Sequence, residues 1–288
     1  MVIIENEQLK VVISLQGAEL QSLFHKPSNS ERLWSGDPAF WGKRSPVLFP
    51  IVGALKNDSY FYKDKEYHLP RHGFARDHNF ILLSKNAEEA VFSLADSDDT
   101  LNVFPFRFEF IVNYRLVENT LVCAYSVINQ GSEEMLFSLG AHPAFAVNTE
   151  KGIRFSDHYI QFNKEDVINV HKIVNNLISN ECAGIKLKDR SLKLDHALFY
   201  NDALVMKNLK SDRLSLLNIC DGSGLHFSFK DFPFFGIWSA TDADFICLEP
   251  WCGIADGVGH DQQLENKEGI VKLDGGSDFK RSWEVTCF

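Results

Sequence analysis

The stretch that decides the fold runs from Arg107 to Ile128 and reads RFEFIVNYRLVENTLVCAYSVI. Its first half places apolar or aromatic side chains at every second position, and its second half repeats that alternation. A period of two predicts a β-strand with one buried face. The two halves are separated by Glu118-Asn119, where the chain is expected to turn. The stretch therefore predicts a long antiparallel hairpin inside a large sheet.

Shorter segments with similar patterning lie on both sides of this hairpin, and Gly, Asn and Asp separate them. The predicted strands are Leu9–Leu15, Phe80–Ser84, Ala90–Leu94, Met135–Leu139, Leu204–Lys207, Leu214–Ile219, Gly224–Phe229, Phe234–Ser239 and Phe245–Leu248. Strands do not alternate with helices, which disfavours a Rossmann-like fold. Phenylalanine is abundant, with 24 residues, which suits the core of a sandwich. We predict one all-β domain over residues 1–288, a large antiparallel β-sandwich with little helix.

One segment is ambiguous between helix and strand. Its apolar residues from Val167 to Ile178 fit a period of 3.6, which allows a helix. Several of them are β-branched, which suits strands equally well. Both interpretations stay open at the level of the sequence.

Composition excludes several classes of protein. Apolar residues make up 45% and charged residues 24%, as in an ordered globular chain. The formal net charge of −10 opposes nucleic-acid binding. The longest apolar runs, such as Val47–Leu55, are about half as long as a membrane helix. The start of the sequence does not resemble a signal peptide. The six cysteines form no CxxC pair or zinc spacing, so we expect reduced thiols, no metal and a cytoplasmic protein.

Four polar residues stand out because their neighbours are apolar or form turns. His72 lies in a loop between Pro70 and Gly73, and His142 precedes a proline that stiffens the chain. Glu249 follows the predicted strand Phe245–Leu248, where loss of solvation would raise its pKa and make it a stronger base. Asp195 also lies among apolar residues. Taken singly, each has an ordinary structural interpretation: a surface or core histidine, or a paired carboxylate.

Read together, these segments resemble the aldose 1-epimerase (galactose mutarotase-like) family, and most of all its LacX-like branch. The resemblance spans most of the chain, and its motifs follow the order of the family. The segments that carry it are Gly17–Leu23, Arg44–Gly53, His72–Arg76, His142–Phe145 and Leu248–Pro250.

The resemblance implies a β-supersandwich with an open cleft and an isomerase that interconverts the α and β anomers of a free hexose. Glu249 would be the base that takes the proton from the C1 hydroxyl. His142 would be the acid that protonates the ring oxygen, and His72 would hydrogen-bond near that oxygen. Asp195 would bind sugar hydroxyls, although Asp202 lies close by in the sequence. This reaction requires no cofactor and no metal, only an acid and a base with pKa values near neutrality.

One departure from the family concerns arginine. Galactose mutarotases commonly carry a Gly-Arg motif before the first histidine, and the corresponding stretch here has no arginine. Arg44 and Arg76 instead resemble arginines that hexose-6-phosphate mutarotases place near the phosphate. We expect one of them to contact the substrate, with a structural salt bridge as the alternative.

Other functions therefore stay open. They are a hexose-6-phosphate mutarotase, a non-catalytic carbohydrate-binding protein on the same fold, and a glycosidase in which Asp195 and Glu249 flank the bond. In each case the expected partner is a small carbohydrate, and the protein is expected to be a monomer or a homodimer without nucleic-acid or membrane partners.

Overall fold

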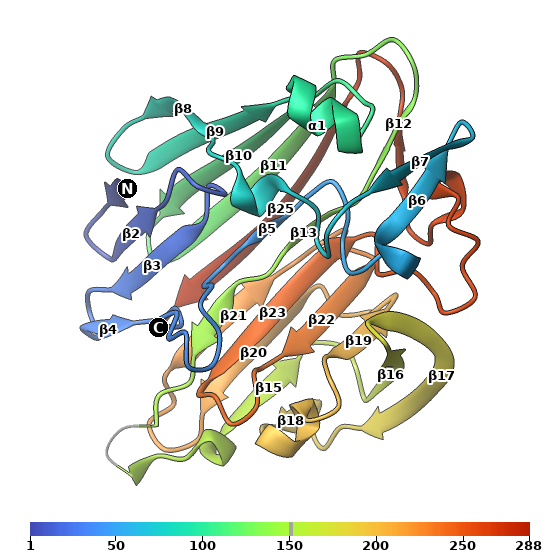
Figure 1. The fold of residues 1–288 in the computed structure, drawn as a ribbon. Coiled ribbons are helices and arrows are strands. Elements are labelled where there is room, and N and C mark those ends of the chain that lie inside the picture. Colours follow the sequence, from blue (N-terminus) through green and yellow to red (C-terminus); the bar gives the residue numbers. More distant parts are fainter. Residues whose placement is uncertain (150–151) are drawn as a thin grey trace.

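Two large sheets dominate the computed structural model, which describes residues 1–149 and 152–288 (Figure 1). The nine-stranded sheet contains, in spatial order, β18 (Ser191–Lys193), β15 (His158–Phe162), β20 (Arg213–Asn218), β21 (Gly224–Ser228), β25 (Asp278–Cys287), β11 (Thr120–Asn129), β10 (Phe108–Val117), β9 (Glu89–Ala95) and β8 (Ile81–Lys85). The eight-stranded sheet contains β17 (Leu177–Lys186), β16 (Val167–Val174), β19 (Leu204–Lys207), β22 (Phe234–Trp238), β23 (Phe245–Cys252), β13 (Leu139–Ala141) and β5 (Val47–Leu48), with β14 (Ala144–Ala146) also paired to β23. The predicted all-β antiparallel sandwich is thus confirmed.

The predicted hairpin lies in the nine-stranded sheet as β10 and β11. Its register pairs Phe110 with Val127, and the turn falls at Glu118-Asn119 as expected. Side chains alternate along both strands between buried and more exposed positions. This alternation directs one face of the sheet toward the core.

Aromatic side chains join the inner faces of the two large sheets. The ring of Phe227 on β21 lies 6.2 Å from that of Phe235 on β22, measured between centroids. The ring of Phe49, which follows β5, lies 4.8 Å from that of Phe110 on β10. Because an aromatic ring buries a large apolar area, such pairs contribute strongly to the stability of the sandwich.

Three small sheets and little helix complete the fold. The small sheets are formed by β1 (Val2–Glu5), β2 (Leu9–Ile13), β3 (Leu20–His25) and β4 (Ser30–Glu31), by β6 (Ser59–Tyr62) and β7 (Lys65–His68), and by β12 (Met135–Phe137) and β24 (Val271–Leu273). The α-helix α1 (Asp98–Val103) begins at Ser97, which forms a capping box with Thr100. In the described ranges no helix is both long and apolar enough to cross a membrane. All six cysteines are free thiols, as predicted.

The structure resolves the ambiguous segment in favour of strands. Residues 167–178 form β16, a turn at Asn175-Asn176 and the start of β17. Both asparagines have positive φ, the conformation that a tight hairpin turn requires. The backbone is extended because β16 and β17 pair with each other, which satisfies their hydrogen bonds without a helix.

Most predicted strands match the observed bounds to within two residues, but two differ more. The segment Met135–Leu139 is divided between β12 and β13, which belong to different sheets. The strand that begins at Phe245 continues to Cys252, so Glu249 lies within β23 and not after its end. The central position of β23, between β22 and β13, explains why the strand stays regular through this carboxylate.

Candidate active site

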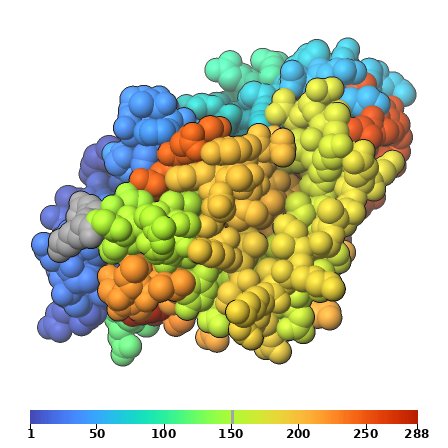
Figure 2. Space-filling model, turned by 90° about the horizontal axis from the view of Figure 1, so that it is seen from below, coloured from blue at the N-terminus to red at the C-terminus, as the bar shows by residue number. Residues whose placement is uncertain are grey.

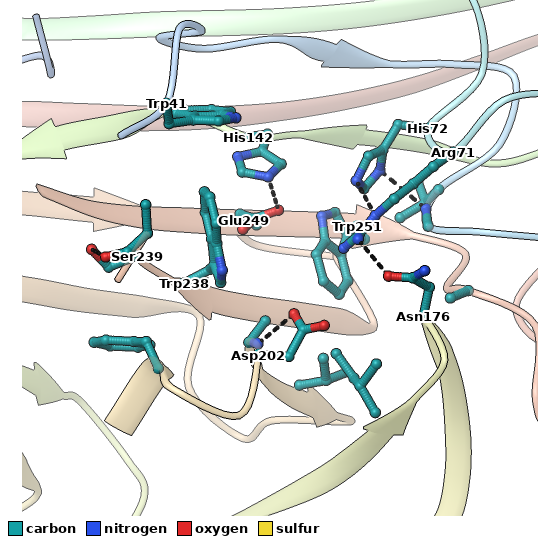
Figure 3. A pocket seen from close by; sticks show the side chains of 18 of the residues that line it. Trp41, Arg71, His72, His142, Asn176, Asp202, Trp238, Ser239, Glu249 and Trp251 are labelled. Carbon is teal, nitrogen blue, oxygen red and sulfur yellow. Dashed lines mark hydrogen bonds and ion pairs between the residues drawn. The ribbon is translucent and has the colours of Figure 1, made fainter. Parts of the chain in front are cut away.

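A cavity of about 730 Å³ opens on the eight-stranded sheet, a volume in the range typical of small-molecule sites. Strands β19, β22 and β23 contribute to its walls, as does the β16–β17 hairpin, and loops close its sides (Figure 3). In the space-filling view from below, the yellow and amber segments that include β16 to β19 cover much of the visible face (Figure 2). The polar and aromatic lining residues are Phe40, Trp41, Arg71, His72, Arg76, His142, Asn176, Phe199, Tyr200, Asp202, Trp238, Ser239, Thr241, Glu249 and Trp251.

Glu249 and His142 meet at one wall of this cavity. The Glu249 Oε2 atom lies 3.1 Å from Nε2 of His142, and the two residues are only 2% and 8% exposed. Glu249 is held by the central strand β23, and His142 by the tight link between β13 and β14, where Pro143 restricts the backbone. The sequence thus identified two residues that the fold brings into contact.

Burial changes the acidity of both groups. It raises the pKa of the Glu249 carboxyl well above its ordinary value and lowers the pKa of His142 to about 3. Both shifts favour uncharged forms, because the surroundings solvate charge poorly. Over the 3.1 Å that separates them, a protonated Glu249 carboxyl and a neutral His142 can share one proton between Oε2 and Nε2.

His72 contributes a second imidazole to the same cavity. Burial lowers its pKa well below the ordinary value, so the ring is neutral. The backbone N–H of Gly53 donates to Nδ1 over 3.1 Å. The Nε of Arg71 donates to Nε2 of the same ring over 3.2 Å, so both ring nitrogens face a donor, and a neutral imidazole can accept at only one of them. The rings of His72 and His142 lie 5.7 Å apart, edge to face.

The loop that holds His72 is fixed by close backbone packing. His72 itself has a φ of 70°, and Gly73 follows with 71°. A Cβ at position 73 would lie 2.3 Å from the carbonyl oxygen of Phe49, so only glycine fits there. Uncommon backbone conformations of this kind are concentrated at functional sites, where surrounding structure enforces them.

Asp202, and not Asp195, lies at the cavity. Asp195 is exposed and its Oδ1 accepts from the backbone N–H of Ala197 over 2.9 Å, which caps the short 3₁₀ helix His196–Phe199. Asp202 lines the cavity, and its charge contributes to the raised pKa of Glu249. Asp195 was predicted to face the substrate, but it is not among the residues that line the cavity. Its placement gives no support to a glycosidase in which Asp195 and Glu249 flank the bond.

The comparisons with known proteins agree with this geometry. The family model described as aldose 1-epimerase matches residues 1–268. The chain belongs to the aldose 1-epimerase family. It is 32% identical to the plasmid-encoded protein LacX of Lactococcus lactis subsp. lactis, over 98% of each chain. The predicted resemblance to the LacX-like branch is thus confirmed.

Solved structures support the same assignment. A galactose mutarotase related enzyme from Lactobacillus acidophilus is 37% identical, with a TM-score of 0.96 over 100% of this chain and 97% of that one. A galactose mutarotase-like protein from Lactobacillus casei is 30% identical, with a TM-score of 0.94 over the whole of both chains. The aldose 1-epimerase fold is therefore shared over the full length.

The two arginines predicted for substrate contact occupy different places in this epimerase-family chain. Arg76 lines the cavity, and its Nη2 donates to the carbonyl oxygen of Arg71 over 2.8 Å. Arg44 lies outside the cavity, where its Nη1 donates to Gln21 and its Nε to the carbonyl oxygen of Ser35. Arg44 therefore anchors the loop that leads to the cavity residue Trp41.

Several cavity residues were not predicted from the sequence. Trp41 stacks on His142 with ring centroids 4.9 Å apart, and Trp238 meets the same imidazole edge to face at 5.8 Å. Arg71 lies with its Nε 3.2 Å from Nε2 of His72 and donates from Nη1 to Asn176 Oδ1 over 3.0 Å (Figure 3). Its position next to His72 was the only sequence signal for Arg71. Trp41 and Asn176 come from a loop and a hairpin turn that carry no such signal.

Proposed function

We propose that this protein is an aldose 1-epimerase that interconverts the α and β anomers of a free hexose. The observation that carries the proposal is the buried pair of Glu249 and His142, 3.1 Å apart at the wall of a cavity of sugar-binding size. Mutarotation needs one group that removes a proton from O1 and one that adds a proton to the ring oxygen. Because the two residues share one proton, each of them can serve as the acid or as the base. The pair therefore suits both directions of the reaction.

The proposed reaction begins when the shared proton moves from Glu249 to His142, which leaves Glu249 as the carboxylate. Glu249 takes the proton from the C1 hydroxyl while His142 gives its proton to the ring oxygen, and the bond from C1 to that oxygen breaks. His72 hydrogen-bonds near the ring oxygen and stabilises the charge that develops there. Rotation about the C1–C2 bond and the reverse proton transfers give the other anomer, with no net change in protonation.

Magnetisation-exchange NMR on equilibrated glucose and galactose, with catalytic amounts of protein, tests the proposal directly. Faster exchange between α and β signals is expected for at least one of these sugars. Detectable sugar binding without any acceleration would contradict catalysis and would instead support a carbohydrate-binding protein.

The two aspartates provide a matched test of substrate binding. Asp202→Asn is expected to lower kcat/KM by about tenfold or more, because hydrogen bonds to a charged group contribute about 1.5–3 kcal/mol. Asp195→Asn is expected to leave kcat/KM unchanged within error, because asparagine caps a helix about as well as aspartate. A loss of activity in the Asp195 variant alone would show that Asp195, and not Asp202, binds the sugar.

A second candidate substrate is a hexose 6-phosphate, because Arg71 and Arg76 both line the cavity. If the phosphate binds there, kcat/KM for glucose 6-phosphate should exceed that for glucose. Arg76→Ala should reduce this preference about tenfold or more, since charge-assisted hydrogen bonds are lost. Arg44 lies outside the cavity, so Arg44→Ala is the control. It should change kcat/KM for glucose and for glucose 6-phosphate by the same factor. An unchanged preference in Arg76→Ala would exclude a phosphate role for Arg76.

A further inference from the structure

A third potential metal ligand lies beside the proposed acid–base pair. A ligand atom from each of His142, Cys247 and Glu249 lies within 4.8 Å of the other two, and all three residues are buried. Cys247 and Glu249 are two residues apart on β23, so their side chains point to the same side of the strand. Ala144 on β14 pairs with Cys247, and this pairing places the nearby His142 next to them.

The types of the three donor atoms suit a tetrahedral zinc ion. Zinc bonds of about 2.0–2.3 Å to nitrogen, oxygen and sulfur give distances of roughly 3.3–3.6 Å between ligand atoms. The 3.1 Å separation of His142 Nε2 and Glu249 Oε2 is already close to such an edge, and the Cys247 sulfur, within 4.8 Å of both atoms, would move closer when the ion binds. A thiolate favours zinc over magnesium or calcium, which prefer oxygen ligands. One thiolate and one carboxylate would also neutralise the charge of the ion in this buried place.

The ion can reach Glu249 and His142 from the open cavity that both residues line, whereas Cys247 is fully buried and does not line it. Zinc bound there would use the lone pairs of Oε2 and Nε2 that the proposed reaction needs. We propose that His142, Cys247 and Glu249 form a zinc-binding site and that zinc bound there inhibits the enzyme. The inhibition rests on the proposed function, whereas the binding of the metal does not.

Binding is tested first with Co²⁺ and Zn²⁺ on protein treated with a chelator and kept in a reductant without thiols. One Co²⁺ per chain is expected, with a thiolate-to-cobalt charge-transfer band in the near ultraviolet. Zn²⁺ should displace it. Cys247→Ala and Cys247→Ser should both lose the band and bind zinc at least tenfold more weakly. The control is Cys252→Ala, since Cys252 is buried on the same strand but points to the opposite side. The control should keep the band.

Inhibition is then measured as the ratio of anomer exchange rates with and without Zn²⁺ within each variant. Zinc should slow the wild type and Cys252→Ala at least tenfold, and the Cys247 variants much less. The absence of metal binding to the wild type, or equal binding by the Cys247 variants, would overturn the site. Equal slowing of the Cys247 variants would overturn the inhibition. A cobalt band that depends on Cys247, in a protein that accelerates no sugar, would support the site and contradict the proposed function.

Discussion

Replacing Glu249 with glutamine is expected to slow catalysed anomer exchange by about 10²–10⁴-fold, the usual contribution of a general base. Glutamine has nearly the same shape, and its amide N–H can donate to His142 Nε2 in place of the carboxyl. It cannot accept the proton from O1. The loss should therefore appear in kcat, because sugar contacts elsewhere in the cavity are kept.

Exchange NMR under saturating sugar measures this loss, and thermal unfolding checks the fold. Glu268→Gln is the matched control, since Glu268 pairs with Lys207 at the surface and does not line the cavity. The control should keep the wild-type rate. A Glu249→Gln protein that folds normally and keeps more than a tenth of the wild-type rate would show that another group is the base.

The second large effect is expected for His142→Asn, again about 10²–10⁴-fold in kcat. Asparagine occupies less space than histidine and cannot deliver a proton to the ring oxygen. Because Glu249 and His142 are proposed to act as one unit, the double variant should lose much less than the product of the two single losses. Non-additivity of this kind distinguishes a shared proton transfer from two independent contributions.

The other histidines make this experiment specific. His72→Asn should reduce kcat less than His142→Asn does, because His72 is proposed to donate a hydrogen bond and not a proton. His226→Gln is the control, since His226 contacts Ser215 and does not line the cavity. A larger loss in His72→Asn than in His142→Asn would show that His72, and not His142, gives the proton to the ring oxygen.

The candidate site divides into residues that the sequence could identify and residues that it could not. His72, His142 and Glu249 were identifiable because each is polar within an apolar or turn-rich segment and because their motifs follow the order of a known family. Asp195 was chosen as a polar residue among apolar neighbours, and Asp202 could have been chosen on the same ground. In the structure, Asp195 only caps a 3₁₀ helix. The difference between them is the direction in which a short loop presents each side chain, and local sequence does not determine that direction.

Arg44 and Trp41 illustrate the same limit. Arg44 was predicted at the substrate but forms hydrogen bonds with Gln21 and Ser35. Trp41 had no distinguishing signal, and it stacks on His142 only because its loop folds back over the eight-stranded sheet. Contacts of this kind join residues far apart in the chain, so composition and periodicity contain no information on them.

By itself, the sequence determined the strands and the class of fold, because alternation of apolar and polar residues acts on neighbouring positions and fixes which face is buried. It left residues 167–178 open, since β-branched residues at helical spacing satisfy both patterns. Only the tertiary structure chose strands there, through the pairing of β16 with β17 and β19. Tertiary structure also decided the acidity of the site. Glu249 and His142 have shifted pKa values because distant segments exclude water from both of them and place them in contact.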